Sequence, residues 1–139
     1  MEAIDMLQAL NTGHDGSLST GHANSPKDMI SRLETMVLMG MDLPLPAIER
    51  QIASGLDIIV HLGRLRDKSR KVLEVTEVLG YWDGQIHLQT IYRYEEIRKE
   101  DENVTENEKK DQENKVHGEW KKVAELFHRE KLVAAGYYI

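Results

Sequence analysis

Cysteine is absent from this chain of 139 residues, and phenylalanine occurs once. Without a thiol the protein can form neither disulfide bonds nor thiolate metal sites, because both need a cysteine sulfur. This composition fits a cytosolic protein. The length suits one domain, or one domain with a tail, and 40% hydrophobic residues with 30% charged residues indicate a soluble globular fold.

Long apolar runs are also absent. No stretch approaches the roughly 18 residues that a membrane-spanning helix needs, so we expect no direct membrane insertion. The opening residues Met1 to Asp5 carry acids where a secretory signal has basic residues, so we expect no signal peptide. The net charge is −6, which disfavours nucleic-acid binding through phosphate neutralisation.

The phosphate-binding loop of nucleotide-hydrolysing enzymes is missing as well. That loop reads Gly-x-x-x-x-Gly-Lys-Ser/Thr, and none of the ten glycines is followed by lysine. No strand ending in an acid precedes the first predicted helix, so the acids that coordinate magnesium and polarise water are absent from these residues too. Any phosphate that this chain binds must therefore be bound in another way.

Three helices are predicted in the first 55 residues. Ala3, Leu7 and Leu10 recur at helical spacing and predict a helix over 2–11. Ser25-Pro26 favours a second helix start, because serine caps a helix and proline fits its first turn. That helix should continue to about residue 40, and a third is predicted over 46–54.

The remaining chain is predicted to contain strands and a final helix. A short strand is expected at 17–20. Residues 56–94 read as an antiparallel meander, in which Asp83-Gly84 is a two-residue hairpin signal. The stretch 95–118 reads as an acidic linker, because it offers little apolar surface to offset its ordering entropy. Residues 119–139 read as a C-terminal helical segment, with the helix itself over about 119–134.

Two histidines in the glycine-rich stretch, His14 and His22, are the sharpest chemical feature. A neutral imidazole donates one hydrogen bond and a charged one attracts an anion, so this stretch can form a phosphate-sensing loop. The helix starting at Pro26 should add free N–H groups. The alternatives are a tight turn with surface histidines, and a metal site with Asp15 that matches no compact ligand spacing.

The other histidines and the hydroxyl residues give weaker indications of a functional site. His61 and His87 lie in strand patterns and read as face or edge residues, whereas His117 and His128 read as solvated. Serines and threonines are near His14 and His22, but no Gly-x-Ser-x-Gly elbow supports nucleophilic catalysis.

The stretch Glu2 to Thr20, followed by His22-Ala23-Asn24-Ser25-Pro26, resembles the histidine-box region of the type II/type IV secretion ATPases. Within that family it resembles most the tight-adherence (Tad, Flp-pilus) assembly ATPases. The resemblance covers about residues 2–94 and rests mainly on the pattern Thr-Gly-His-…-Ser-Thr-x-His-Ala-Asn.

The resemblance implies an α/β fold, namely the C-terminal portion of a RecA-like P-loop core with an incomplete sheet, an antiparallel meander and a C-terminal helix. It implies a homo-hexameric ring that uses ATP and Mg²⁺ at the cytoplasmic face of the inner membrane, with membrane platform proteins as partners. It also assigns roles to five residues. By position, His22 is the residue that senses the terminal phosphate, and the nucleotide-binding residues are Thr12, Gly13, His14 and Asn24.

The sequence departs from this family in several ways. Gly21 replaces a common aliphatic residue, and Lys99 to Lys115 matches poorly. The nucleotide loop and the acidic strand of the family lie upstream of the histidine box, so we expect the chain to be a C-terminal fragment, of weak stability and inactive alone, that binds no cofactor tightly. The alternatives are a free-standing regulatory subunit that docks on a full-length ring, and a small metal-dependent hydrolase.

Overall fold

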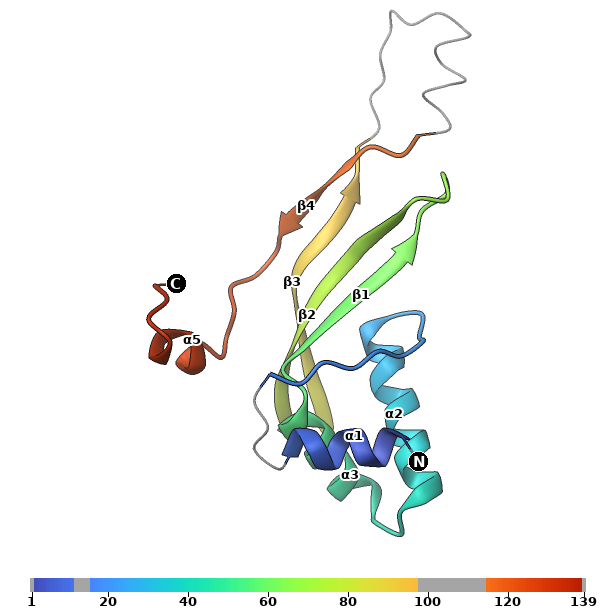
Figure 1. Ribbon diagram of the computed structural model, residues 1–139, viewed down its shortest axis with the longest axis vertical. Coiled ribbons are helices and arrows are strands. Elements are labelled where there is room, and N and C mark those ends of the chain that lie inside the picture. The colour runs from blue at the N-terminus through green and yellow to red at the C-terminus, as the bar shows by residue number, and fades with distance from the viewer. Residues whose placement is uncertain (1, 12–15, 98–114, 139) are drawn as a thin grey trace, which may run out of the picture.

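The computed structural model describes residues 2–11, 16–97 and 115–138. Three helices come first: α1 (Glu2–Asn11), α2 (Pro26–Gly40) and α3 (Leu45–Gly55). They confirm the helices predicted from periodicity, to within one residue at each end. Figure 1 shows these helices gathered at one end of a long twisted sheet.

The sheet has four antiparallel strands in the order β1-β2-β3-β4. Its strands are β1 (Ile58–Arg64), β2 (Arg70–Trp82), β3 (Gln85–Glu96) and β4 (Gly118–Lys122). The predicted antiparallel meander is therefore confirmed, and it extends by one strand beyond residue 94. Asp83 (φ 51°) and Gly84 (φ 74°) form the tight β2–β3 turn, which needs left-handed backbone at both positions. The observed fold is a small α/β arrangement with this sheet on one side, and no parallel pair occurs among the described strands.

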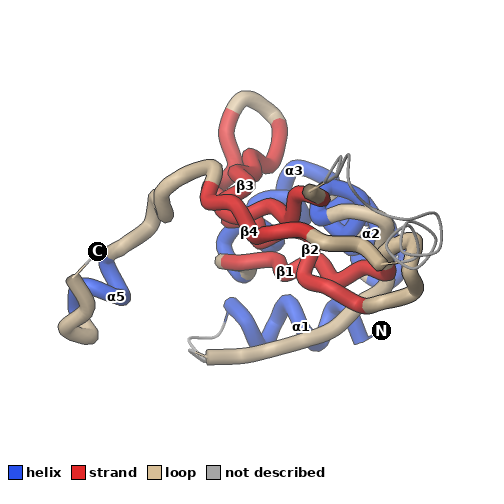
Figure 2. Tube along the Cα trace, turned by 90° about the horizontal axis from the view of Figure 1, so that it is seen from above, coloured by secondary structure: helices blue, strands red, loops and turns tan. Residues whose placement is uncertain are grey.

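The core lies between the three helices and the near end of the sheet. Its buried members come from the helices, and partly buried residues of β1 and β3 close it. They are Leu7, Ile30, Leu33, Val37, Ile48 and Ile52, closed by Ile59, Ile86 and Leu88. Figure 2 shows the C-terminal segment with α5 (Glu130–Ala134) lying apart from the three helices.

The predicted helix over 119–134 is wrong for most of its length. Residues 118–122 form β4, and only the short helix α5 (Glu130–Ala134) remains. Pairing with β3 overrides the helical periodicity, because Trp120 lies opposite Tyr94 and the two rings make an edge contact with centroids 5.3 Å apart. At the borders of the expected acidic linker, Glu95 and Gly118 also belong to paired strands, and residues 98–114 lie outside the described residues.

Asp67 holds the β1–β2 turn against the start of the C-terminal segment. Its carboxylate accepts hydrogen bonds from the backbone N–H of Ser69 (2.9 Å) and of Val116 (2.9 Å), and from the Ser69 hydroxyl (2.5 Å). The Ser69 hydroxyl bond and the two backbone bonds lower the pKa of Asp67 to about 2. The carboxylate is therefore the form that the folded protein stabilises.

This lowered pKa predicts how the turn responds to acid. Because the folded pKa lies below the unfolded value of about 3.9, the stabilisation is complete above about pH 4 and is lost as the pH falls through about 2. The amide proton shifts of Ser69 and Val116, followed by NMR, should titrate with a midpoint near pH 2. The Asp67→Asn variant should abolish that titration, and a midpoint near pH 4 in the parent chain would contradict the assignment.

Candidate functional site

The histidine segment is an extended connection, not a strand. Residues 17–24 have no ladder partner in the described sheet, and Leu18 is fully exposed. The strand predicted at 17–20 is therefore wrong for this structure. The physical reason is that a strand needs a hydrogen-bonded neighbour for its backbone groups, and no described strand pairs with this segment.

His22, the predicted phosphate sensor, lies three residues before the cap of α2 with its side chain exposed. The segment passes close to the Met29 side chain of α2 at Gly21. A Cβ atom at position 21 would lie 2.6 Å from Cε of Met29, whose side chain packs against the helical core. Because Cε is the far end of a flexible side chain, a larger residue at position 21 would require only a shift of the Met29 side chain.

The first turn of α2 is closed by its own side chains. Ser25 Oγ accepts the backbone N–H of Asp28 at 3.0 Å, and the Asp28 carboxylate accepts the backbone N–H of Asn24 at 3.0 Å. A negative charge of the protein therefore already lies at the positive end of the helix dipole. Ser25 therefore takes up one of the N–H groups, that of Asp28, that this helix start was expected to offer to a phosphate.

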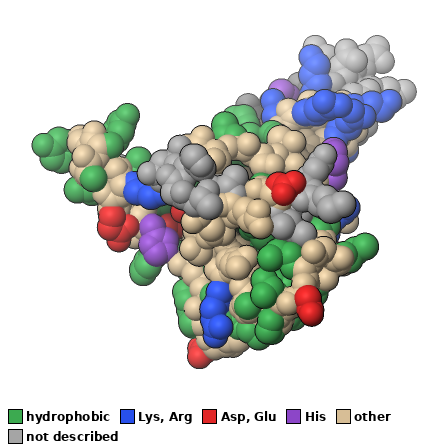
Figure 3. All heavy atoms as spheres, turned by 60° about the horizontal axis from the view of Figure 1, so that its bottom comes forward, with side chains coloured by type: hydrophobic (Ala, Val, Ile, Leu, Met, Phe, Trp, Pro, Cys, Tyr) green, Lys and Arg blue, Asp and Glu red, His purple; other side chains and the backbone are tan. Residues whose placement is uncertain are grey.

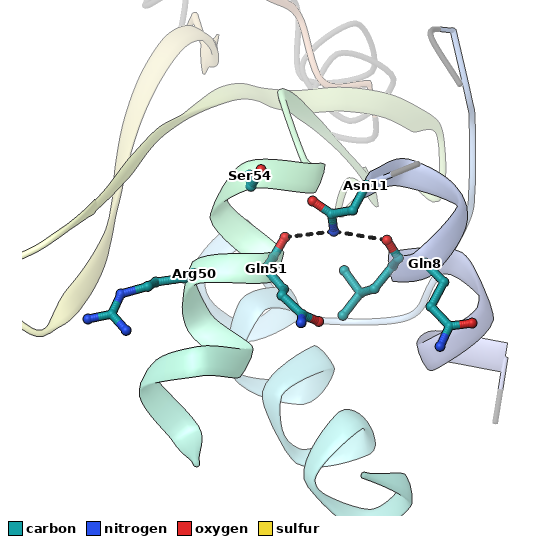
Figure 4. Close-up of a pocket in the computed structure, with 6 residues that line it drawn as sticks. Gln8, Asn11, Arg50, Gln51 and Ser54 are labelled. Carbon is teal, nitrogen blue, oxygen red and sulfur yellow. Dashed lines mark hydrogen bonds between the residues drawn. The ribbon is translucent and has the colours of Figure 1, made fainter. Parts of the chain in front are cut away.

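Of the remaining predicted nucleotide-binding residues, Asn24 lies among the described residues. Asn24 is exposed beside the cap, and its backbone bond fixes the chain next to His22. Thr12, Gly13 and His14 lie outside the described residues. Asn11, directly before them, was not singled out by the sequence. Its side-chain amide donates to the carbonyls of Leu7 (2.9 Å) and Gln51 (3.1 Å), which ties the end of α1 to α3 (Figure 4).

An open pocket of about 450 Å³ lies between α1 and α3 beside Asn11. Six residues line it, and the surface that they present is mostly apolar: Leu7, Gln8, Asn11, Arg50, Gln51 and Ser54. Figure 4 shows the Arg50 side chain directed away from Asn11 and Gln8. Its guanidinium lies instead over the ring of Tyr81, 5.2 Å from the centroid. The pocket therefore presents mainly apolar surface and lacks the converging cations that a triphosphate requires.

Among the described residues, no three histidine or acidic side chains converge into a metal-binding group, and His14 and Asp15 lie outside that set. His61 and His87 lie in β1 and β3, as predicted. His87 stacks on Trp82 with ring centroids 3.8 Å apart. His128 is exposed, as predicted, and its Nε2 lies 2.7 Å from the Leu79 carbonyl oxygen.

A known protein family matches most of the chain. Residues 1–125 match the family described as "Type II/IV secretion system protein". The chain therefore belongs to the type II/IV secretion system protein family. No helix in the described part of the chain is long and apolar enough to cross a membrane.

Individual relatives carry names from conjugation and secretion. A conjugal transfer protein of Mycobacterium tuberculosis is 34% identical over 91 residues, which are 66% of this chain and 25% of that protein. Conjugal transfer protein TrbB of Rhizobium radiobacter is 33% identical over 88 residues, 63% of this chain and 25% of that protein. Type IV secretion system protein VirB11 of Brucella suis is 36% identical over 64 residues, 44% of this chain and 18% of that protein. The chain thus spans about a quarter or less of the length of these relatives.

Proposed function

We propose that this chain supplies the histidine-box region of a secretion ATPase with a RecA-like core, of the tight-adherence branch. In this proposal His22 contacts the terminal phosphate of Mg-ATP, in a hexameric ring at the cytoplasmic face of the inner membrane that works with membrane platform proteins. The observation that carries the proposal is the family match over residues 1–125 together with the exposed imidazole of His22 beside a capped helix.

The described residues fit part of a nucleotide site. The exposed imidazole of His22 can donate a hydrogen bond to a phosphate oxygen. The closed first turn of α2 and the neutral pocket beside Asn11 do not form a triphosphate cradle. Mg-ATP would bring the reactive phosphate and its neutralising cation, and the residues of this chain would bind and sense it from one side. We therefore expect no tight ATP binding and no hydrolysis by the 139 residues alone.

A chimera tests the role of His22. In a full-length family member that hydrolyses ATP, the region matching this chain is exchanged for the chain's own residues. His22→Ala in this chimera should lower kcat by about a hundredfold, the usual cost of losing one group that stabilises developing charge. His87→Ala is the matched control, because His87 lies on β3 and stacks on Trp82. An active chimera in which His22→Ala leaves kcat unchanged would refute the assignment.

The 139-residue chain by itself gives a second test. Fluorescent ATP analogues should show no saturable binding to it, and phosphate release should stay at the background rate. Turnover by the isolated chain would overturn the expected inactivity. If the chain instead changes kcat of a full-length family ATPase when titrated into it, the regulatory-subunit alternative replaces the fragment interpretation.

A further inference from the structure

The far end of the sheet carries a concentration of positive charge that the proposed function does not use. Five cations occur in the eight residues from Arg64 to Lys71, against one acid, Asp67. This excess runs against the net charge of −6 of the whole chain. Figure 3 shows lysine and arginine side chains gathered at one end of the molecule.

Most of these cations point into solvent. Arg64, Arg66, Lys68 and Arg70 are all exposed around the β1–β2 turn. Arg66 is paired with Glu96 at 2.6 Å. Within the described ranges, Arg64, Lys68 and Arg70 have no acidic partner at ion-pair distance. Among the described residues, these three exposed cations are therefore the ones placed to meet an anionic surface.

Exposed apolar side chains lie along β1, the strand that ends at Arg64. Along β1, Ile58, Val60 and Leu62 project away from the helices, since the intervening Ile59 packs against the helical core. Their exposure rises towards the basic end, to 66% at Leu62. Leu62 pairs in register with Val72 of β2.

An aromatic side chain completes the same region. The Trp120 indole N–H donates to the Val72 carbonyl at 2.7 Å, and the ring stays half exposed. Lys71 Nζ lies 5.9 Å from the centroid of that ring. An exposed leucine, a half-exposed tryptophan and a group of cations therefore surround one strand end.

We propose that this surface, the basic tip (Leu62, Arg64, Lys68, Arg70, Lys71 and Trp120), docks on an anionic lipid bilayer. Cations gain from the negative surface potential, tryptophan favours the headgroup level, and an exposed leucine enters the acyl boundary. A nucleic acid would bind the cations, but the exposed apolar side chains Ile58, Val60 and Leu62 of β1 would have no role in binding it. This proposal rests on the membrane-face location proposed above and adds the surface that contacts the bilayer. The contact itself requires no nucleotide.

Vesicle flotation of the intact chain tests this proposal without ATP. The chain should float with vesicles made of equal parts phosphatidylglycerol and phosphatidylcholine, and should stay in solution with pure phosphatidylcholine. The triple variant Arg64→Gln/Lys68→Asn/Arg70→Gln should weaken binding by about a hundredfold, since each cation near an anionic bilayer contributes about fivefold. Asparagine is chosen at position 68 because Lys68 has φ 67°, which asparagine tolerates. Added salt should weaken binding of the parent chain.

Matched controls separate lipid from other anions. Lys27→Gln/Arg32→Gln/Arg50→Gln removes three exposed cations from the helices and should leave vesicle binding unchanged. Leu62→Ser should reduce vesicle binding several-fold without changing binding to duplex DNA. The proposal is overturned if the parent chain does not float with anionic vesicles, or if the helix variant loses as much binding as the tip variant. It is also overturned if DNA binds more tightly than vesicles and Leu62→Ser has no effect. None of these results depends on His22, so failure here leaves the proposed ATPase role untouched.

Discussion

Replacing Ile48 by alanine should lower the free energy of unfolding by about 3–4 kcal/mol. Ile48 lies on α3, is 0% exposed and belongs to the same buried cluster as Val37 of α2 and Ile52 of α3. Alanine would leave a cavity bounded by helices on more than one side. The surrounding side chains cannot fill it without moving whole helices, so both transfer and cavity costs apply. Urea denaturation followed by circular dichroism measures the change.

Met39→Ala is the matched control for that experiment. Met39 lies on the same helical unit, near the end of α2, but is 84% exposed. Its replacement should change the free energy of unfolding by less than about 0.5 kcal/mol. Equal effects of the two substitutions would mean that the helical cluster is not the core of the folded chain.

Glu77→Gln should release the C-terminal segment from the sheet. Glu77 is 2% exposed on β2, and its two carboxylate oxygens accept the backbone N–H groups of Phe127 and His128, each at 2.8 Å. Glutamine has nearly the same shape but presents an NH₂ group to one of these two donors. One charge-assisted hydrogen bond is lost and a repulsive contact replaces it, at a cost of about 3 kcal/mol.

Hydrogen exchange measures this release directly. The amides of Phe127 and His128 should exchange about a hundredfold faster in Glu77→Gln, because about 3 kcal/mol corresponds to that change in the opening equilibrium. The amides of Val37 and Ile48 should keep their protection. Glu130→Gln, an exposed acid on α5, is the control and should leave all four amides unchanged. Unchanged exchange at Phe127 and His128 in Glu77→Gln would show that Glu77 does not hold this segment.

Local signals explain which parts of the fold could be predicted. The helices depend on apolar spacing and on Ser25-Pro26, and the β2–β3 hairpin depends on Asp83-Gly84, whose turn needs left-handed backbone. Each of these signals acts within a few residues. The segment after residue 116 carried equally local helical spacing, yet it forms β4 because β3 presents an open edge. That edge is created by residues far away in sequence.

For the candidate site, too, the sequence indicated one part, the family, and did not indicate the other, the local contacts. The pattern that ends in His22-Ala23-Asn24 indicated the family, and the match over residues 1–125 confirms the family as type II/IV secretion system proteins. The sequence did not indicate that Asp28 closes the first turn of α2, or that Gly21 accommodates Met29. Both depend on how an irregular connection folds back onto a helix, and no periodicity encodes that path.

The sequence by itself thus determined the helices, the meander and the family, because propensity, periodicity and motif are properties of neighbouring residues. Only the tertiary structure decided that the C-terminal segment joins the sheet and that Glu77 binds it. Only the tertiary structure also placed Trp120 beside the cations of the β1–β2 turn. These features join residues about 50 positions apart, such as Lys71 with Trp120 and Glu77 with Phe127. Contacts of that kind follow from closing the chain around a shared core, which no local pattern specifies.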